Sequence, residues 1–542
     1  MKNLIVFVLM FFSVSLFAQK VKETKIITNP MNEEFSYGFN YDENSGTYAV
    51  SIYDTISGKY YILSNKGNSV EHSSFYLENI IFDNDGNYYL TAQDITDTSD
   101  SGSTKNYFTK NGKDLFSYEY INENIVADGK YIYFLASDSA GDRMIKYDIR
   151  KNKFEYSRRY NYVYLCYSPI PSGFSNREYV FTPGLTKNND VYYIASRNDE
   201  EFLVIGDEEQ KHYKSIDANS VTEDKKGNLC YIAMNPENDT STYSVVVQGN
   251  KEYKKCYNAM GPILFNDDNI PVYAASDTPA EYSIVHNLYI GNQKGKYYDN
   301  DISNITVSEN GKIAYAATQS INDSETYSFV VFDGKEGKRY DNILSIVFSK
   351  DEKPVYIASI DTNYFVVSGM QEQKYKYPFI YDLSVSPKGQ IAYVGKESFI
   401  VDSVPQSKIF IHIGNNVFGP YHSEYYEPET QIDLIYFDDK DNYAYLAAND
   451  SDFSEESILY KLYARNWQSE SFDYIDYTQV YDGNVYYAGY NSGNDISKIY
   501  KNKNKIAGDY KRIYNYKFNL DDEEITFIGL KNNIYYFVKI EL

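Results

Sequence analysis

The chain has 542 residues, with 52 Lys and Arg against 76 Asp and Glu, which gives a formal net charge of −24. This length exceeds one ordinary domain core and fits either two large β domains or one long repeat array. The negative charge argues against nucleic acid and against anionic membrane surfaces as partners, because like charges repel.

Residues 1 to 18 have the three-part pattern of a signal peptide. Lys2 supplies a short positive region, Leu4 to Phe17 form an apolar stretch, and Ala18 precedes the expected cleavage. A stretch of 14 apolar residues is short for a membrane span, which needs about 20. We therefore predict an exported, periplasmic or extracellular protein that starts at Gln19 and has no membrane span.

One phrase then recurs along the chain: a β-rich run, a turn, and an alternating strand that ends in Tyr-x-Ala. The clearest copies are ITVSENGKIAYAAT from Ile305, IVFSKDEKPVYIAS from Ile346 and LSVSPKGQIAYVGK from Leu383. The small residue after the strand returns at a period near 42 residues through the mature chain. Its positions are Ala49, Ala92, Ala136, Ala195, Ala233, Ala275, Ala317, Ala358, Gly395, Ala447 and Ala488, and Val538 closes a weaker twelfth copy.

One period contains four short strands joined by turn chemistry, such as Asn310-Gly311. Four strands in about 40 to 45 residues is the size of a propeller blade. In KIAYAA, Ile313 and Tyr315 share one face and Ala314 and Ala316 the other, so both faces are apolar or aromatic, as in a sheet packed between two others. We predict an all-β fold of about twelve four-stranded blades.

The phrases TVSENGKIAYAA, VFSKDEKPVYIA and SVSPKGQIAYVG resemble the WD40-like repeat of TolB-type β-propellers, whose hydrophobic-Ser-Pro-Asp-Gly turn is followed by a strand. Only Ser386-Pro387-Lys388-Gly389 keeps the Ser-Pro and the Gly together, with Lys in place of Asp. The Gly-His and Trp-Asp dipeptides of true WD40 repeats are absent. The resemblance implies a β-propeller fold and an extracytoplasmic binding role.

Twelve copies are more than the 4 to 8 blades of an ordinary propeller. We predict two tandem rings, an N-terminal propeller over residues 19–297 and a C-terminal propeller over residues 298–542. The most regular copies, from Tyr213 to Gly395, cross this midpoint without a linker. A split of seven and five blades, or one unusually large ring, therefore remains as an alternative.

Few residues suggest a metal site, a disulfide or a catalytic role. The cysteines are Cys166, Cys230 and Cys256, which lack the spacing of a zinc site and allow at most one disulfide. Cys230 takes the place of Ala314 in the repeat, so we expect it to be buried. The five histidines have no metal-ligand spacing, and we expect surface or loop roles for His72, His212, His286, His412 and His422.

Two acidic turns invite a calcium hypothesis: Asp83, Asp85 and Gly86, and Asp438, Asp439 and Asp441. Neither has the ligand pattern of an EF-hand, and both lie at the recurring hairpin turn, so we expect a backbone role. Recurring pairs at Tyr257-Asn258, Tyr298-Asp299 and Tyr340-Asp341 predict a packing or turn role, with an acidic ring in a central channel as the alternative. We predict no metal site and no cofactor, and the catalytic and binding residues stay unknown.

The chain has no Gly-x-Ser-x-Gly elbow. We predict a non-catalytic binding or scaffold module of the cell envelope, whose partner is an envelope protein, a peptide or a glycan. The 62 tyrosines are compatible with this, since their rings offer both an apolar face and a hydroxyl. Long loops at Tyr147 to Asn189 and Val401 to Asp441 are the expected recognition segments. The alternative is a propeller enzyme acting on polysaccharide, a glycosidase or lyase.

Overall fold

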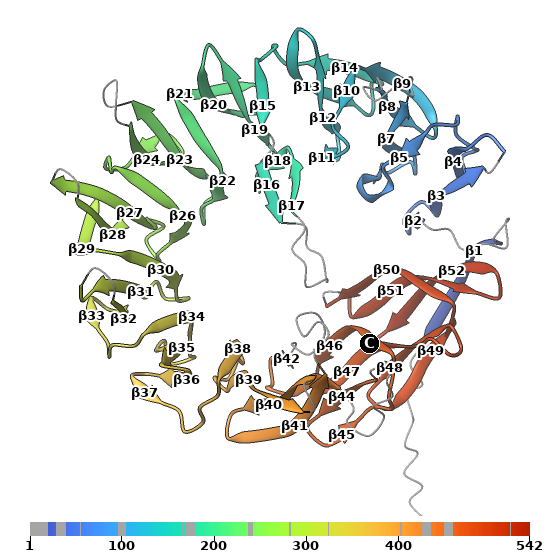
Figure 1. Cartoon of the computed structure of the whole chain (residues 1–542). Helices are drawn as coiled ribbons and strands as arrows, with labels where there is room; N and C mark the ends of the chain where they lie inside the picture. The colour runs from blue at the N-terminus through green and yellow to red at the C-terminus, as the bar shows by residue number, and fades with distance from the viewer. Residues whose placement is uncertain are drawn as a thin grey trace, which may run out of the picture.

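The computed structural model describes residues 20–28, 39–54, 56–95, 104–164, 166–169, 179–236, 242–280, 283–322, 325–401, 404–424, 435–448, 459–520 and 522–542. The predicted signal peptide lies outside these ranges. The described residues form twelve antiparallel sheets of three to five strands in a ring, and one short hairpin (Figure 1). The chain is therefore a β-propeller of twelve blades, which we number in chain order.

The first six blades contain the following elements. Blade 1 has β2 (Phe39–Asp42), β3 (Thr47–Asp54) and β4 (Lys59–Ser64); blade 2 has β5 (Ser74–Phe75), the 3-10 helix η1 (Leu77–Asn79), β6 (Ile81–Phe82), β7 (Tyr88–Ile95), β8 (Thr104–Lys110) and β9 (Lys113–Tyr118); blade 3 has β10 (Tyr120–Ile121), β11 (Val126–Ala127), β12 (Tyr131–Asp138), β13 (Gly141–Asp148) and β14 (Lys153–Tyr156). Blade 4 has β15 (Tyr162–Tyr164), β18 (Gly184–Leu185), β19 (Val191–Arg197), β20 (Glu200–Ile205) and β21 (Glu208–Tyr213), with the separate hairpin β16 (Cys166–Pro169) and β17 (Tyr179–Thr182); blade 5 has β22 (Ser215–Glu223), β23 (Leu229–Pro236), β24 (Thr242–Gln248) and β25 (Lys251–Glu252); blade 6 has β26 (Asn258–Phe265), β27 (Pro271–Ala280), β28 (Ser283–Ile290) and β29 (Gln293–Tyr298).

The last six blades are more regular. Blade 7 has β30 (Asp301–Val307), β31 (Ile313–Ser320), β32 (Thr326–Phe332) and β33 (Lys335–Glu336); blade 8 has β34 (Asn342–Phe348), β35 (Pro354–Ile360), β36 (Asn363–Ser368) and β37 (Gln371–Glu372); blade 9 has β38 (Phe379–Val385), β39 (Ile391–Val401), β40 (Val404–Ile413) and β41 (Asn416–Glu424). Blade 10 has β42 (Ile435–Phe437), β43 (Tyr443–Ala448), β44 (Tyr460–Ala464) and β45 (Trp467–Gln468); blade 11 has β46 (Tyr474–Tyr481), β47 (Asn484–Asn491), β48 (Ile496–Lys501) and β49 (Asn504–Tyr510); blade 12 has β50 (Arg512–Asn519), β51 (Glu524–Lys531), β52 (Ile534–Glu541) and the N-terminal strand β1 (Val21–Thr28).

The two ends of the chain meet in blade 12. Strand β1 pairs antiparallel with β52, from Val21 opposite Ile540 to Thr28 opposite Ile534. The first strand of the chain is therefore the outermost strand of the last blade, beside the red end of the ring in Figure 1. Since these pairings join distant segments, they hold the ring closed.

Each blade packs on the next through a cluster of buried apolar side chains. The twelve clusters of the described residues follow the ring blade by blade, and the last of them joins blade 12 to blade 1. In that closing cluster Phe39 and Val50 pack on Ile528, Leu530 and Tyr535. Burial on both faces explains why the second and third strands of a blade lack the polar face of an ordinary antiparallel sheet.

Of the arrangements left open by the sequence, the structure has the single large ring. The expected boundary at residues 297 and 298 falls inside β29, and Tyr298 belongs to the cluster shared by blades 6 and 7, with Leu288 and Phe329. The physical reason is that closure is decided by which blades share a core, and the first blade shares its core with the last.

The small residue of the repeat is required by the ring that covers it. A Cβ at Gly395 would lie 2.4 Å from the ring of Tyr377, and a Cβ at Gly529 would lie 2.4 Å from the ring of Tyr510. The strand register places Gly489 and Gly529, rather than Ala488 and Val538, at this position. The sequence-based assignments of Ala488 and Val538 are therefore wrong. The position is defined by packing against the preceding blade and not by the local residue pattern of the strand.

Two of the outermost strands are very short and charged. β25 and β33 are two-residue Lys-Glu strands, a common protection against pairing between sheet edges. Among the described residues no helix has the length and apolar character to cross a membrane.

Candidate functional site

The acidic turns serve the backbone, as expected. Asp83 Oδ1 accepts hydrogen bonds from the N–H groups of Asp85 and Asn87 at 3.0 and 2.8 Å, and Oδ2 accepts one from the Tyr89 hydroxyl at 2.8 Å. Burial raises the pKa of Asp83, but the hydrogen bonds from Asn87, Tyr89 and Asp85 outweigh it and hold the pKa below its usual range. Asp438 Oδ1 likewise accepts the N–H groups of Lys440 and Asn442 at 2.9 and 2.8 Å, and Oδ2 accepts the N–H of Gly483 in the next blade at 2.7 Å. In the part of the chain that the structure describes, no three His, Cys, Asp or Glu residues gather as a metal site.

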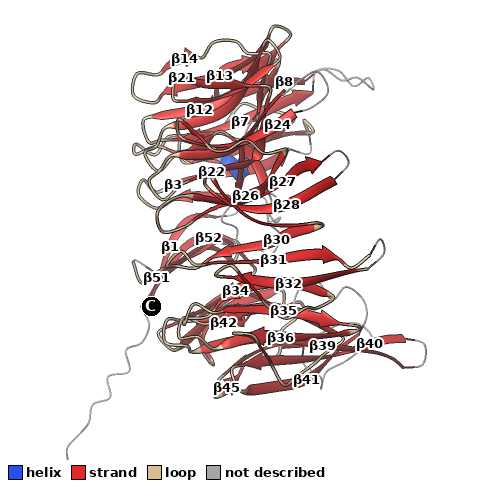
Figure 2. Ribbon diagram, turned by 90° about the vertical axis from the view of Figure 1, so that its left-hand side faces the viewer, coloured by secondary structure: helices blue, strands red, loops and turns tan. Residues whose placement is uncertain are grey.

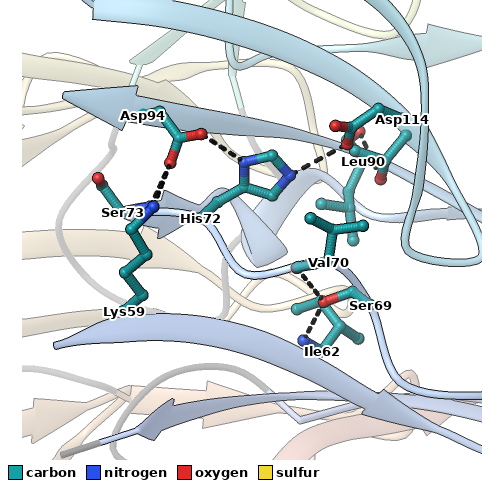
Figure 3. Close-up of polar contacts among 10 residues, drawn as sticks. Lys59, Ile62, Ser69, Val70, His72, Ser73, Leu90, Asp94 and Asp114 are labelled. Carbon is teal, nitrogen blue, oxygen red and sulfur yellow. Dashed lines mark hydrogen bonds and ion pairs between the residues drawn. The ribbon is translucent and has the colours of Figure 1, made fainter. Parts of the chain in front are cut away.

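The expectation of surface or loop roles is wrong for His72, whose side chain is 2% exposed. Its Nδ1 lies 3.2 Å from an oxygen of Asp94, and its Nε2 lies 3.0 Å from an oxygen of Asp114 (Figure 3). The backbone pairs it with Tyr60, as Tyr340 and Tyr377 are paired in their blades. His72 thus takes the place of the recurring aromatic residue and links blades 1 and 2 through two carboxylates.

His412 is also buried, which corrects the same expectation. It stacks on Tyr393 with ring centres 4.3 Å apart, and its Nε2 is hydrogen-bonded to the Tyr377 hydroxyl at 2.8 Å. Burial lowers the pKa of His412 to about 4, so the ring is neutral at pH 7. His412 and His422 are not paired with each other across the two strands. His412 pairs with Val417, and His422 pairs with Lys408.

The remaining candidates have packing roles. Cys230 is fully buried, as predicted, and burial raises its pKa to about 12; Cys256 is a second buried free thiol with the same shift. Tyr298 and Tyr340 are buried between blades, which confirms the packing role of the Tyr-Asp pairs. The pair at Tyr257-Asn258 is displaced by one residue, because Cys256 occupies the buried position and Tyr257 is 45% exposed.

The aspartates of these pairs bind a turn and do not form an acidic ring. Asp299 accepts the N–H of Ser320 at 2.9 Å, and Asp341 accepts the N–H of Asp361 at 2.6 Å. Each of them therefore caps the hairpin between the second and third strands of the next blade.

A cleft of about 390 Å³ opens at the rim between blades 3 and 4. Its floor is aromatic, with Tyr160 and Tyr193 buried. Glu209 on its wall is bound by Arg197 at 3.0 and 2.6 Å and lies 3.8 Å from Arg158. Glu209 is thus neutralised within the protein, and burial keeps the phenol of Tyr193 protonated by raising its pKa.

The two expected recognition loops lie in different places. The segment from Tyr147 to Asn189 includes the hairpin of β16 and β17, which extends into the middle of the ring (Figure 1). The segment from Val401 to Asp441 includes β40 and β41, and its residues 425–434 lie outside the described ranges.

The two faces of the ring differ in their exposed apolar side chains. We call the side that carries the turns between second and third strands the hairpin face; these hairpins project to the right in Figure 2. Four successive hairpins, in blades 6 to 9, each expose one isoleucine, and these residues form what we call the isoleucine arc. They are Ile284, Ile321, Ile360 and Ile400, with exposed fractions of 52, 62, 36 and 75%.

Other apolar residues are exposed on the same face. Ile56 and Ile95 occupy the hairpins of blades 1 and 2, and Tyr257 and Phe379 lie exposed where the innermost strands of blades 6 and 9 begin, on the same face. On the opposite side, which we call the turn face, the turns within the described residues expose two large apolar side chains, Met370 and Leu520. Apolar exposure is therefore concentrated on the hairpin face.

Comparison with protein-family models and with curated proteins finds no match. Solved structures similar to this chain include the β-propeller domain of the Trilobed protease from Pyrococcus furiosus, at 12% identity and a TM-score of 0.25, covering 52% of this chain and 95% of that one. The tricorn protease is similar at 11% identity and a TM-score of 0.24, covering 93% of this chain and 52% of that one. Oligogalacturonate lyase in complex with manganese is similar at 10% identity and a TM-score of 0.27, covering 62% of this chain and 97% of that one.

Proposed function

We propose that the protein is an exported, non-catalytic binding or scaffold module of the cell envelope, and that its partner docks on the hairpin face. The observation that carries this proposal is the isoleucine arc, in which four successive blades repeat the same exposed aliphatic side chain. Single exposed apolar residues are ordinary, but a continuous series on one face is typical of an interaction site.

The scaffold supports this function. The hairpins project from blades whose second and third strands are buried on both sides, so the ring presents them as fixed points. Loops on such a rigid framework are where recognition usually takes place. Binding at several equivalent points also raises the overall affinity without a deep pocket.

Three of the groups with shifted pKa values have structural roles. Asp83, Asp438 and His412 have perturbed pKa values, and each has partners that give it a structural role. Perturbed groups in a catalytic site would instead converge on a space open to substrate.

The test is affinity capture from envelope extracts of the cells that produce the protein. We expect the wild-type chain and the control Met370→Ser to retain the same partner, and the double variant Ile321→Ser/Ile360→Ser to lose it. Met370 is a suitable control because it is 45% exposed on the turn face. Equal capture by the double variant would contradict docking on the arc.

A further inference from the structure

We infer that the isoleucine arc binds a basic protein segment that carries aliphatic side chains. The inference rests on the proposed function and adds the chemistry of the partner. It comes from the carboxylates that surround the middle of the arc, in blades 7 and 8.

Four exposed carboxylates border Ile321 and Ile360. They belong to Asp299, Glu325, Asp341 and Asp361. Asp299 accepts the N–H of Ser320, next to Ile321. Asp341 accepts the N–H of Asp361, next to Ile360. Each isoleucine therefore has negative charge beside it at a fixed place.

These charges are not compensated within the ring. None of the four carboxylates has a salt bridge to another described residue, whereas the acids of the outer rim do. On that rim Lys296 binds Glu336 at 2.5 Å, and Lys338 binds Glu372. These two lysines therefore neutralise acids of the rim, and the four carboxylates beside Ile321 and Ile360 keep their charge.

This pattern selects among occupants. A second copy of the chain, which also has a formal charge of −24, would bring like charges together, and an anionic lipid surface would do the same. A glycan would gain little from aliphatic tips. A protein segment with Lys or Arg beside Leu, Ile or Val fits both features, because its cations meet the carboxylates while its apolar side chains cover the isoleucines.

The experiment measures binding of a labelled synthetic peptide of repeating Leu-Lys-Ser to the mature chain by fluorescence anisotropy. Matched peptides of repeating Leu-Glu-Ser and of repeating Ser-Lys-Ser separate charge from apolar contact. We expect the Leu-Lys-Ser peptide to bind more tightly than either, with an affinity that falls as salt rises.

Two arc variants should weaken that binding roughly tenfold each, the loss expected for about 1.4 kcal/mol. They are Ile321→Ser/Ile360→Ser and Asp341→Asn/Asp361→Asn; the second keeps hydrogen-bond acceptors and removes the charge. The control is Asp207→Asn/Asp333→Asn, which removes two exposed carboxylates from turns of the opposite face and should have no effect.

Other results would overturn the inference. Failure of the Leu-Lys-Ser peptide to bind, equal binding of Leu-Glu-Ser, or equal loss in the control would do so. These results would not decide the proposed function. The capture experiment tests that function separately, because it uses the natural partner and assumes nothing about the partner's charge. A wild-type dimer in sedimentation that Ile321→Ser/Ile360→Ser converts to monomer would assign the arc to a second copy and overturn the inference as well.

Discussion

Blades 7 and 8 differ from blades 3 and 4 at the same structural position. In blades 7 and 8 the hairpin tips expose Ile321 and Ile360 beside carboxylates without salt bridges. In blade 3 the tip is the polar turn Ser139-Ala140, and Asp138 beside it is bound by Arg159, whose Nη2 lies 2.6 Å away. One repeat thus supplies the same backbone to every blade, while the hairpin residues decide whether a blade exposes an aliphatic side chain beside carboxylates without salt bridges.

Blade 4 has the same two features as blade 3. Its tip is the polar turn Asn198-Asp199, and Arg197 beside it binds Glu209 through both carboxylate oxygens. Arg159 and Arg197 thus pair with Asp138 and Glu209, whereas Asp341 and Asp361 have no salt bridge to a described residue.

The largest effect on stability is expected from a substitution in blade 9, the blade that carries Ile400. A Cβ at Gly395 would lie 2.4 Å from the ring of Tyr377, so Gly395→Ala should lower the free energy of unfolding by about 3 kcal/mol, as overpacking does. Chemical denaturation measures this. The control is Gly493→Ala in the hairpin of blade 11, where no heavy atom lies within 4 Å. Equal stability of the two variants would contradict the packing described here.

A smaller effect should come from His412, which also belongs to blade 9. Its folded pKa of about 4 lies below the ordinary histidine value of 6.5, so the unfolded chain takes up the proton first as the pH falls. Stability should therefore drop between about pH 6.5 and pH 4, by about 2 kcal/mol. His412→Phe should remove this part of the pH dependence, as measured by unfolding at several pH values. A parallel pH profile in the variant would be the opposing result. His212 of blade 4 is partly exposed and provides the comparison.

A modest effect is expected from Arg159 in blade 3. Arg159 and the Tyr118 hydroxyl hold the pKa of Asp138 well below its usual range, so their contribution to stability is present above the usual pKa of Asp and is lost as the pH falls below it. Arg159→Met should destabilise the protein at neutral pH and cease to do so in acid. A destabilisation of equal size at both pH values would show that packing, and not charge, is responsible.

The smallest effect on stability is expected when the exposed isoleucine of blades 7 and 8 is transferred to the hairpin tip of blade 3. Ala140 is exposed at the tip of blade 3, so Ala140→Ile should change stability by less than about 0.5 kcal/mol. Alone it should not raise the affinity for the Leu-Lys-Ser peptide, because Asp138 stays neutralised. Combined with Arg159→Met it should raise that affinity. A gain from Ala140→Ile alone would show that apolar exposure suffices without charge.

Much of the fold was readable from the sequence, because Tyr-x-Ala records two needs of each blade, a buried ring and a small residue that leaves room for a ring of the preceding blade. The closure of the ring was not, since it depends on contacts between Phe39 and Tyr535, which no local pattern connects. The shifts at Gly489 and Gly529 were missed for the same reason, as their covering rings come from the preceding blade.

The candidate site was harder to predict. His72 looked like an isolated loop residue because its partners Asp94 and Asp114 lie on another blade. The arc had a weak signal, an isoleucine at the end of an otherwise polar hairpin in S-I-N-D and S-I-D-T. Only the repeat register shows that Ile321 and Ile360 stand at equivalent tips on one face.

The most direct test of the central claim is site-specific photo-cross-linking in the cells that produce the protein. A photoreactive residue placed at position 321 on the hairpin face is compared with one placed at position 370 on the turn face, both exposed in the free chain. The account predicts a discrete cross-linked complex from position 321 and none from position 370. Cross-linking to the same partner from position 370, with none from position 321, would contradict it.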